Sequence, residues 1–320
     1  LAVVYAAIYI AAIFMCLKWM GLKHIPVFVV ACFAVLGVML DGNYLVWFNS
    51  LYGEPMMCIG LLLFVAAVLN AIRSETLRLK NLLFLFMAAF LFLGSKAQCI
   101  TALPFVAFMV IRLSTAKSIF FFSRKNRLQL TSPVHSSTGR YALPSAVVWA
   151  ISLVLLIAYP MGFYSQQSKT CGVDTKYNAV FYGILKNSDD PEKDLEMLGL
   201  SGDLAVETGK HAYLPPDEYV RYVPWSEITL NEFNNKMSNL KLIWFYLQNP
   251  RRLLEGMKYT ASQSFQTGTF LGKYEKDDVP AYTYTFSRFT YWSDFRAGFL
   301  PKKLWFIVAV YLTAFIISAI

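Results

Sequence analysis

The sequence predicts an all-α polytopic membrane protein, and three observations support this prediction. Hydrophobic residues make up 57% of the 320 residues and charged residues only 15%, whereas soluble proteins carry about 25% charged residues. The apolar residues are gathered in long blocks along the chain. Blocks such as "NLLFLFMAAFLFL" lack the polar face at helical spacing that the buried helix of a soluble protein shows.

A helix needs about 20 residues to cross a bilayer, and seven apolar stretches of the chain are close to this length. The fourth and fifth are short, and we interpret them as a tight hairpin whose turn, "GSKAQ", dips into the membrane. Because Leu1 and Ile320 both lie inside apolar runs, we expect the chain to be a fragment of a longer protein. The stretches are Leu1–Leu17, Ile25–Leu40, Pro55–Ile72, Leu82–Gly94, Ala97–Ile111, Ala142–Phe163 and Leu304–Ile320.

The distribution of charge predicts how these spans are oriented, since cytoplasmic loops collect Lys and Arg. One alternating set of loops holds a single acid, Glu75, and eleven bases. The long segment 163–301 has 15 bases and 17 acids, and we expect it to lie outside. The predicted organisation is six spans in 1–162, an extracytoplasmic loop domain in 163–301 and a seventh span in 302–320. The eleven bases are Lys18, Lys23, Arg73, Arg78, Lys80, Arg112, Lys117, Arg124, Lys125, Arg127 and Arg140.

The familiar motifs of soluble proteins do not account for this chain. The stretch "GTFLGKY" is one residue too short for a P-loop and lacks its Ser or Thr. The three histidines are scattered over both sides of the membrane, so we expect no zinc site. The net charge of +9 follows from the topology, and a nucleic-acid partner is not expected.

The long segment nevertheless has the signals of a folded domain. "NSDDPEKDLEMLGLSG" offers Ser188 and Asp190 as helix caps, Pro191 as the first helical residue and Gly199 as the end. The amphipathic stretch Asn239–Phe265 suits a helix that lies on the membrane surface, broken or kinked at Pro250.

Two groups of residues are candidates for a binding site. The first is the aromatic stretch Ala281–Arg296, which is either an interfacial aromatic belt or a wall for a sugar whose phosphate is held by Arg. The second is the polar stretch "NYLVWFNSLYGEP" with the short outer loops beside it, whose only ionisable residues are Asp41, Glu54 and Lys96. Glu54 and Lys96 either stabilise the ends of their helices or face each other across a phosphate-bearing substrate. The two groups supply the candidates Asp41, Asn49, Tyr52, Glu54, Lys96, Gln98, Arg288, Trp292, Asp294 and Arg296.

The order of the segments resembles the GT-C class of membrane glycosyltransferases. The local stretches "FNSLYGEP", "FLGSKAQ", "NAVFYGILKNSDDPEKDLEMLGL", "FYLQNPRRLLE", "LGKYEK" and "WSDFR" resemble the hexosyltransferases assigned to cell-surface (S-layer) glycan assembly in Gram-positive bacteria. The resemblance covers nearly the whole chain and implies a GT-C-like helical bundle with a large, partly helical outer domain. It also places the leading catalytic acid of the class in an outer loop before Leu1, which leaves Glu54 and Asp41 in a secondary acidic loop.

This resemblance implies transfer of a hexose from a polyprenyl-phosphate-linked donor to a glycan or glycolipid acceptor. A carboxylate, Glu54 with Asp41, would act as general base on the acceptor, and the leaving phosphate would be held by Lys or Arg. Lys96, Arg288 and Arg296 are the main candidates for the phosphate, with Lys302 and Lys303 as weaker ones. The carboxylates are alternatively ligands of a divalent cation, Mg²⁺ or Mn²⁺, or of the acceptor. Two other classes stay open: a flippase or transporter of a polyprenyl-linked glycan, and a membrane anchor for a surface-binding domain.

Overall fold

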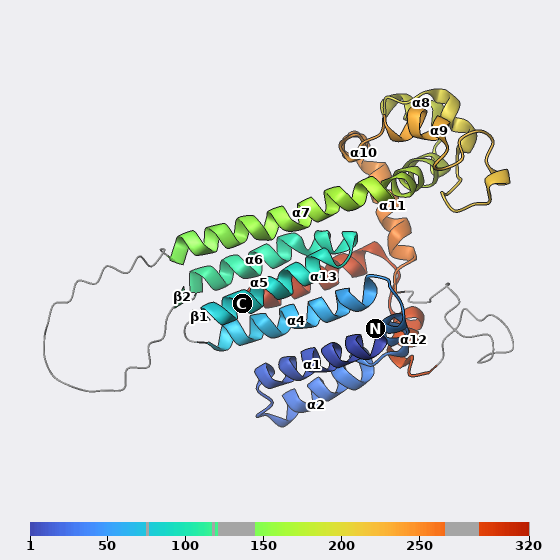
Figure 1. The fold of residues 1–320 in the computed structure, drawn as a ribbon. Helices are drawn as coiled ribbons and strands as arrows, with labels where there is room; N and C mark the ends of the chain where they lie inside the picture. The colour runs from blue at the N-terminus through green and yellow to red at the C-terminus, as the bar shows by residue number, and fades with distance from the viewer. Residues whose placement is uncertain (75–76, 117–118, 121–144, 266–287, 320) are drawn as a thin grey trace, which may run out of the picture. The chain divides into compact units, whose positions relative to one another are not determined.

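The computed structural model of the chain describes residues 1–74, 77–116, 119–120, 145–265 and 288–319 (Figure 1). Nearly all of its elements are helices, and its two strands, β1 (Leu77–Arg78) and β2 (Ile119–Phe120), form one short parallel pair. The predicted all-α class is therefore confirmed. The chain divides into two compact units, unit 1 within Leu1–Tyr164 and Thr267–Ser293 and unit 2 within Ser165–Gln266 and Asp294–Ile320.

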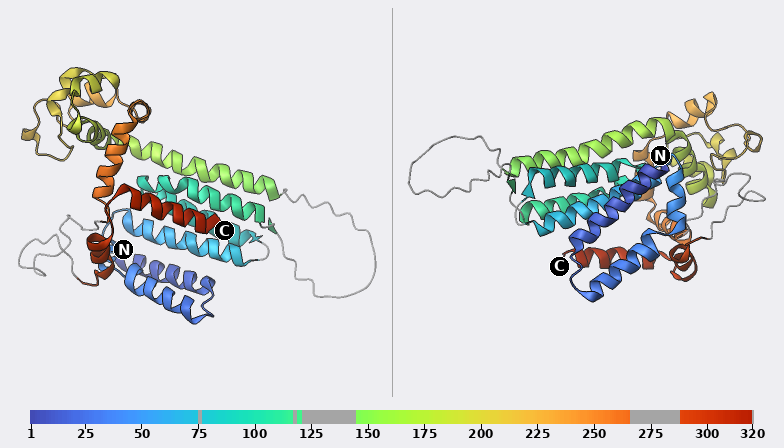
Figure 2. Two further views of the ribbon diagram at one scale, coloured as in Figure 1. Left: turned by 180° about the vertical axis from the view of Figure 1, so that it is seen from behind. Right: turned by 60° about the horizontal axis from the view of Figure 1, so that its bottom comes forward.

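Unit 1 is a bundle in which α1 packs along α4 and α4 packs along α5, as both views of Figure 2 show. The helix α7 begins in this unit and continues to Tyr177, past the predicted end of its span at Phe163. The elements are α1 (Ala2–Met20), α2 (Ile25–Phe33), the π-helix η1 (Ala34–Met39), α3 (Gly42–Leu45), the 3-10 helix η2 (Val46–Asn49), α4 (Glu54–Arg73), α5 (Leu79–Gly94), the 3-10 helix η3 (Ala97–Ala102), α6 (Leu103–Ala116) and α7 (Ser145–Tyr177).

Where the structure describes them, nearly all residues of the predicted spans lie on helices, but the helices differ in length. Among the described residues, three helices are long and apolar enough to cross a membrane: Ala2–Met20, Glu54–Arg73 and Trp149–Gln166. A fourth span is formed if the pair Ile25–Met39 and Gly42–Asn49, bent by 54°, is taken as one. The apolar helices Leu79–Gly94, Ala97–Leu113 and Leu304–Ile316 are shorter. The chain is thus a multi-pass membrane protein, whereas seven full crossings stay a prediction.

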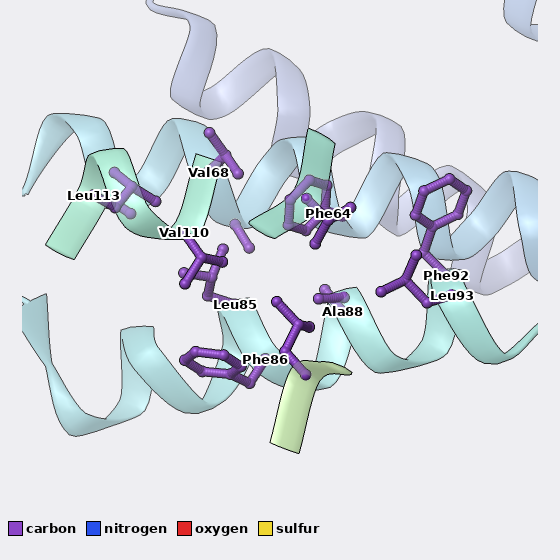
Figure 3. Close-up of a cluster of buried hydrophobic side chains, with 14 of the residues drawn as sticks. Phe64, Val68, Leu85, Phe86, Ala88, Phe92, Leu93, Val110 and Leu113 are labelled. Atoms are coloured by element: carbon purple, nitrogen blue, oxygen red, sulfur yellow. The ribbon is translucent and has the colours of Figure 1, made fainter. Parts of the chain in front are cut away.

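The core of unit 1 is formed by hydrophobic side chains where α4, α5, α6 and α7 meet (Figure 3). Phe64 and Leu85 are buried at its centre. The two helices α4 and α5 approach closely at Gly60, where a Cβ atom would lie 2.8 Å from the backbone nitrogen of Phe92. Small residues at such crossings allow membrane helices to pack through their backbones. Gly60 therefore fixes how α5, and the turn that follows it, lies against α4.

Large apolar side chains also cover the outside of unit 1. Ile25 is 80% exposed, Phe33 73% and Leu36 70%, all on the second apolar stretch. A water-soluble surface rarely carries a contiguous apolar patch of this kind. These helix faces are the surfaces that contact the lipid bilayer.

Unit 2 is a folded helical domain followed by the apolar helix α13. Most of its helices are short. The elements are the end of α7, the π-helix η4 (Asn178–Ile184), the 3-10 helix η5 (Leu185–Asn187), α8 (Pro191–Met197), the 3-10 helices η6 (Gly202–Glu207) and η7 (Pro216–Glu218), α9 (Glu227–Thr229), the π-helix η8 (Leu230–Asn234), α10 (Asn239–Gln248), α11 (Pro250–Ser262), the end of α12 (Tyr291–Phe299) and α13 (Leu304–Ala319).

Of the two caps predicted for α8, Asp190 is confirmed, whereas the Ser188 hydroxyl accepts a hydrogen bond from the backbone nitrogen of Asp190, before the helix begins. The side chain of Asp190 accepts a hydrogen bond from the backbone nitrogen of Lys193 at 3.1 Å, and Pro191 is the first helical residue. Gly199 has φ +67 just beyond the helix end, a conformation that glycine adopts without strain. The predicted break at Pro250 is also confirmed, since α10 ends at Gln248 and α11 begins at Pro250.

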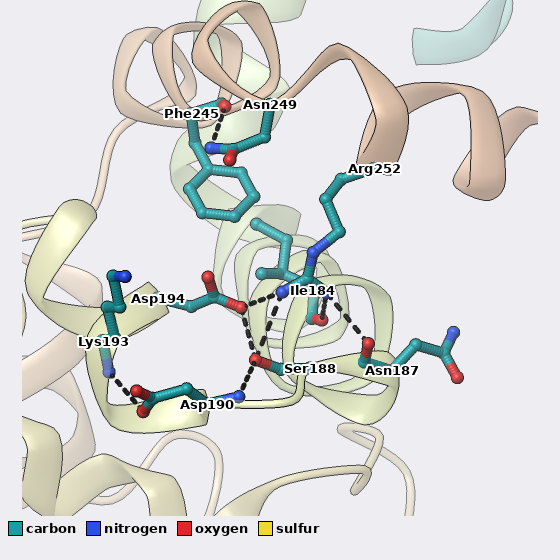
Figure 4. A network of polar contacts seen from close by, with 9 residues as sticks. All are labelled: Ile184, Asn187, Ser188, Asp190, Lys193, Asp194, Phe245, Asn249 and Arg252. Atoms are coloured by element: carbon teal, nitrogen blue, oxygen red, sulfur yellow. Dashed lines mark hydrogen bonds and ion pairs between the residues drawn. The ribbon is translucent and has the colours of Figure 1, made fainter.

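Buried aromatic rings hold the domain of unit 2 together. The rings of Tyr177 and Phe181 lie 4.3 Å apart, and those of Phe181 and Phe233 lie 4.9 Å apart. Beside this core, Arg252 of α11 reaches the carboxylate of Asp194 on α8 (Figure 4). This ion pair connects α11 to α8.

Glu207 is a fully buried carboxylate that organises the segment after η7. Its Oε1 accepts hydrogen bonds from the backbone nitrogens of Val220, Arg221 and Tyr222 at 2.9, 2.8 and 3.0 Å. Its Oε2 lies 2.8 Å from the Nζ of Lys210. Burial by itself raises the pKa of Glu207, but these donors favour the charged form more strongly, so the net pKa lies below its ordinary value.

We therefore expect unit 2 to lose stability in acid. A carboxylate whose pKa is lower in the folded state stabilises the protein above its unfolded pKa, and this stabilisation disappears as the pH falls through the folded pKa. Chemical unfolding is followed by tryptophan fluorescence at a series of pH values from 7 to 3. In the wild type, the denaturant concentration at the midpoint should decrease once the pH is lower than about 4.5. In Glu207→Gln this fall should be smaller, and an identical pH profile in the two proteins would contradict the assignment.

Candidate functional site

Glu54 and Lys96 form an ion pair between two turns of unit 1. Glu54 is the first residue of α4, where Pro55 suits the first turn and an acid is favoured by the helix dipole. Lys96 lies in the turn between α5 and η3. The two side chains are only partly exposed, 19% for Glu54 and 33% for Lys96. The acid and the base from these two turns thus lie in direct contact, and their role toward a phosphate-bearing substrate stays a prediction.

A close backbone contact positions this pair. A Cβ atom at Gly53 would lie only 2.5 Å from the carbonyl oxygen of Ser95. The Ser95 hydroxyl in turn donates a hydrogen bond of 2.7 Å to the carbonyl of Phe92 at the end of α5. The residues directly before Glu54 and Lys96 therefore touch each other, which fixes where the two charged side chains begin.

The two oxygens of the Glu54 carboxylate differ in their surroundings. Oε1 accepts the hydrogen bond from the Lys96 ammonium. Oε2 is buried and has no hydrogen-bond partner among the residues that the structure describes. A buried acceptor left in this state is costly, and such atoms are rare enough in folded proteins to require an explanation. One oxygen of the Glu54 carboxylate is therefore left without a donor in the described part of the chain.

Asp41 is a buried residue with a different environment. Its side chain is 1% exposed. Oδ1 accepts hydrogen bonds from the Asn43 nitrogen at 3.0 Å and the Ser293 hydroxyl at 2.6 Å, and Oδ2 accepts one from the Ser293 nitrogen at 2.8 Å. The nitrogen of Gly42 also donates to the carbonyl of Phe289 at 2.8 Å. Asp41 thus caps α3 and ties it to residues 289–293.

The other predicted residues are distributed over both units. In unit 1, Asn49, Gln98 and Arg288 are exposed, and Tyr52 packs its ring edge-to-face against Trp47 at 5.5 Å. Trp292 lies beside the Ser293 contact of unit 1, whereas Asp294 and Arg296 lie in unit 2. Lys302 and Lys303 also belong to unit 2. Among the predicted site residues, Glu54 and Lys96 contact each other directly. The functional roles of all the predicted site residues stay predictions.

Part of the predicted sugar wall, residues 281–287, lies outside the described residues, as do the P-loop-like "GTFLGKY", the stretch "LGKYEK" and Glu75, Lys117, Arg124, Lys125, Arg127 and Arg140.

The sequence interpretation missed Ser293 and Gly53. Ser293 is buried and stands in "WSDFR" between two residues that were singled out, so its small polar side chain among aromatic and charged neighbours was the available signal. Gly53 stands directly before Glu54 in "LYGEP", and its lack of a Cβ allows the contact with Ser95.

A divalent cation does not fit the described carboxylates. The described residues contain no group of three or more His, Cys, Asp and Glu that is suited to hold a metal ion. The Glu54 carboxylate already faces an ammonium group, which repels a second cation. The oxygens of Asp41 are taken by N–H and O–H donors. We therefore derive no chemistry through Mg²⁺ or Mn²⁺.

The comparison with protein families gives one match. The family model described as the YfdI N-terminal transmembrane domain matches residues 1–320, which is the whole chain. No curated protein and no solved structure matches the chain.

Proposed function

The chain belongs to the YfdI N-terminal transmembrane domain family, and we propose that it is a membrane glycosyltransferase. In this proposal a hexose moves from a polyprenyl-phosphate-linked donor to a glycan or glycolipid acceptor, with segment 163–301 on the outer face of the cell membrane. The observation that supports it best is the partly buried pair of Glu54 and Lys96, in which Glu54 Oε2 has no partner among the described residues. A general base and a phosphate-holding cation at one place are what such a transfer requires.

The proposed reaction is a single displacement at the anomeric carbon of the hexose. The acceptor hydroxyl gives its proton to Glu54 Oε2 as its oxygen bonds to the anomeric carbon. The bond from that carbon to the phosphate oxygen breaks, and its electron pair stays on the phosphate. The leaving group needs no proton because a phosphate is stable as an anion. Lys96 stabilises the charge that develops there.

Asp41 and Ser293 serve this proposal as positioning residues. Their hydrogen bonds hold residues 289–293 against the start of α3, and Trp292 stands next to Ser293. Trp292 and Arg288 are proposed to form part of the wall for the sugar. The aromatic face of Trp292 would pack on the C–H groups of the sugar, and Arg288 would bind the phosphate. Asn49, Tyr52 and Gln98 of unit 1 are proposed to contact the sugar hydroxyls.

One observation favours a second function, the transport or flipping of a polyprenyl-linked glycan. The pair Ile25–Met39 and Gly42–Asn49 is bent by 54°, and Asp41 lies at the break. Broken membrane helices with polar residues at the break line the binding sites of many transporters. In the described structure, however, both oxygens of Asp41 are engaged by Asn43 and Ser293.

Reconstituted protein distinguishes the two functions. We expect purified full-length protein in liposomes to release polyprenyl phosphate from a panel of radiolabelled polyprenyl-phosphate hexoses when acceptor lipid is present. Right-side-out membrane vesicles should use a short-chain donor added from outside, as the proposed orientation requires. Movement of labelled lipid across the bilayer without any release of polyprenyl phosphate would instead support the transporter and contradict the transferase.

A further inference from the structure

Unit 2 contains a groove of about 620 Å³ that the candidate site does not use. It lies between η4, η5, α10, α11 and the first turns of α13. One wall is apolar and includes Leu253 and Met257 of α11 and Leu304 and Ile307 of α13. The volume is in the range of small-molecule sites, which combine apolar walls with a few polar groups.

The polar end of the groove is a cluster of two tyrosines and a lysine. The Nζ of Lys186 donates a hydrogen bond of 2.9 Å to the hydroxyl of Tyr182, which lies 3.5 Å from the hydroxyl of Tyr259. The same Nζ lies 4.0 Å from the centre of the Tyr182 ring. The hydrogen bond from Lys186 lowers the pKa of Tyr182, while Lys186 itself is exposed and charged. Three donor groups thus converge at one end.

The charge of Lys186 is not balanced within the described part of the groove. Lys186 forms no ion pair with a described carboxylate, and the lining acid Glu255 is paired with Arg251 at 3.0 Å. Arg252 also lines the groove, but its guanidinium is engaged by Asp194, Ser188 and two backbone carbonyls. The polar end therefore attracts an anion, and Lys186 is the cation available to it.

The apolar wall indicates that the anion belongs to a lipid. Leu304 and Ile307 are in the first turns of α13, an apolar helix of a membrane protein, directly after Lys302 and Lys303. Lysines in this position mark the level of the lipid headgroups. The ring of Phe265, after α11, packs against Phe306 at 6.2 Å, so the wall of the groove continues onto the surface of α13. Leu304 and Ile307 thus connect the groove to the apolar helix α13.

We propose that this groove binds an anionic phospholipid of the surrounding bilayer. Its phosphate accepts hydrogen bonds from Lys186, Tyr182 and Tyr259, and an acyl chain lies along Leu304 and Ile307. The occupant is a structural or regulatory lipid and not the sugar donor, so the inference does not depend on the proposed transfer. Charge-assisted contacts to phosphate together with apolar burial give such a site its selectivity over zwitterionic lipids.

Native mass spectrometry of delipidated full-length protein tests the proposal with dioleoyl phosphatidic acid and dioleoyl phosphatidylcholine as probes. The wild type should retain phosphatidic acid at collision energies that remove phosphatidylcholine. Lys186→Ala should weaken the retained complex by about tenfold or more, as expected for the loss of a charge-assisted hydrogen bond. Met257→Trp should abolish it by filling the apolar part, although Lys186 is intact.

Lys258→Ala is the matched control, since Lys258 follows Met257 on α11 but does not line the groove. It should bind phosphatidic acid like the wild type, and circular dichroism checks that each variant folds. The proposal is overturned if the two lipids are retained equally, or if Lys186→Ala and Met257→Trp both bind like the wild type. Displacement of the lipid by inorganic phosphate, or retention of polyprenyl phosphate alone, would also overturn it.

Discussion

Glu54→Gln should reduce the rate of hexose transfer at least about a hundredfold, the range typical for loss of a positioned general base. Glutamine has nearly the same shape, and its amide oxygen still accepts the hydrogen bond from Lys96. It has no carboxylate oxygen to take the acceptor proton, which is the role proposed for Oε2. The initial rate of polyprenyl phosphate release by reconstituted protein measures the effect.

The same variant tests the simpler account, in which Glu54 only stabilises the start of α4. Removing a charge that interacts with a helix dipole costs about 0.3–1 kcal/mol of stability and leaves catalysis nearly normal. Glu255→Gln is a suitable control, because the Glu255 side chain is 47% exposed and pairs with Arg251 on the same helix. Full activity of Glu54→Gln would eliminate this carboxylate as the base.

The features that the sequence predicted correctly depend on residues close together in the chain. The cap at Asp190, the start at Pro191 and the left-handed Gly199 are all set within one short helix. The break at Pro250 is equally local, because proline cannot donate the hydrogen bond that a continuous helix needs. Apolar blocks likewise predict helices in a membrane, since only helices and closed barrels satisfy the backbone there.

The features that were missed depend on contacts between distant segments. Asp41 and Ser293 are 252 residues apart, and neither neighbourhood indicates the other. Gly53 meets Ser95 through tertiary packing of α4 on α5. The Glu54–Lys96 contact was anticipated only because alternating spans place both turns on one side. The second apolar stretch ends in a π-helix over Ala34–Met39 and a bend at Asp41. No pattern in the sequence predicted this end.

The largest loss of stability is expected for Arg252→Met in unit 2. The Arg252 guanidinium is 24% exposed and pairs with Asp194, which is 11% exposed. It also donates hydrogen bonds to the carbonyls of Ile184 at 3.3 Å and Asn187 at 3.0 Å, and to the Ser188 hydroxyl at 3.2 Å (Figure 4). These bonds connect α11 to η4, η5 and the start of α8.

Methionine keeps the length and the apolar stem of Arg252 but leaves Asp194 as a buried charge, with Ser188 as its remaining side-chain partner among the described residues. Breaking a buried pair in this way costs about 3–5 kcal/mol. The free energy of unfolding of unit 2, measured by pulse proteolysis of the full chain in detergent, should fall by that amount. The neighbouring Arg251 is the matched control, since it is 92% exposed and pairs with Glu255 four residues on. Arg251→Met should cost no more than about 0.5 kcal/mol, and an equal loss in the two variants would show that the Arg252 network does not stabilise the domain.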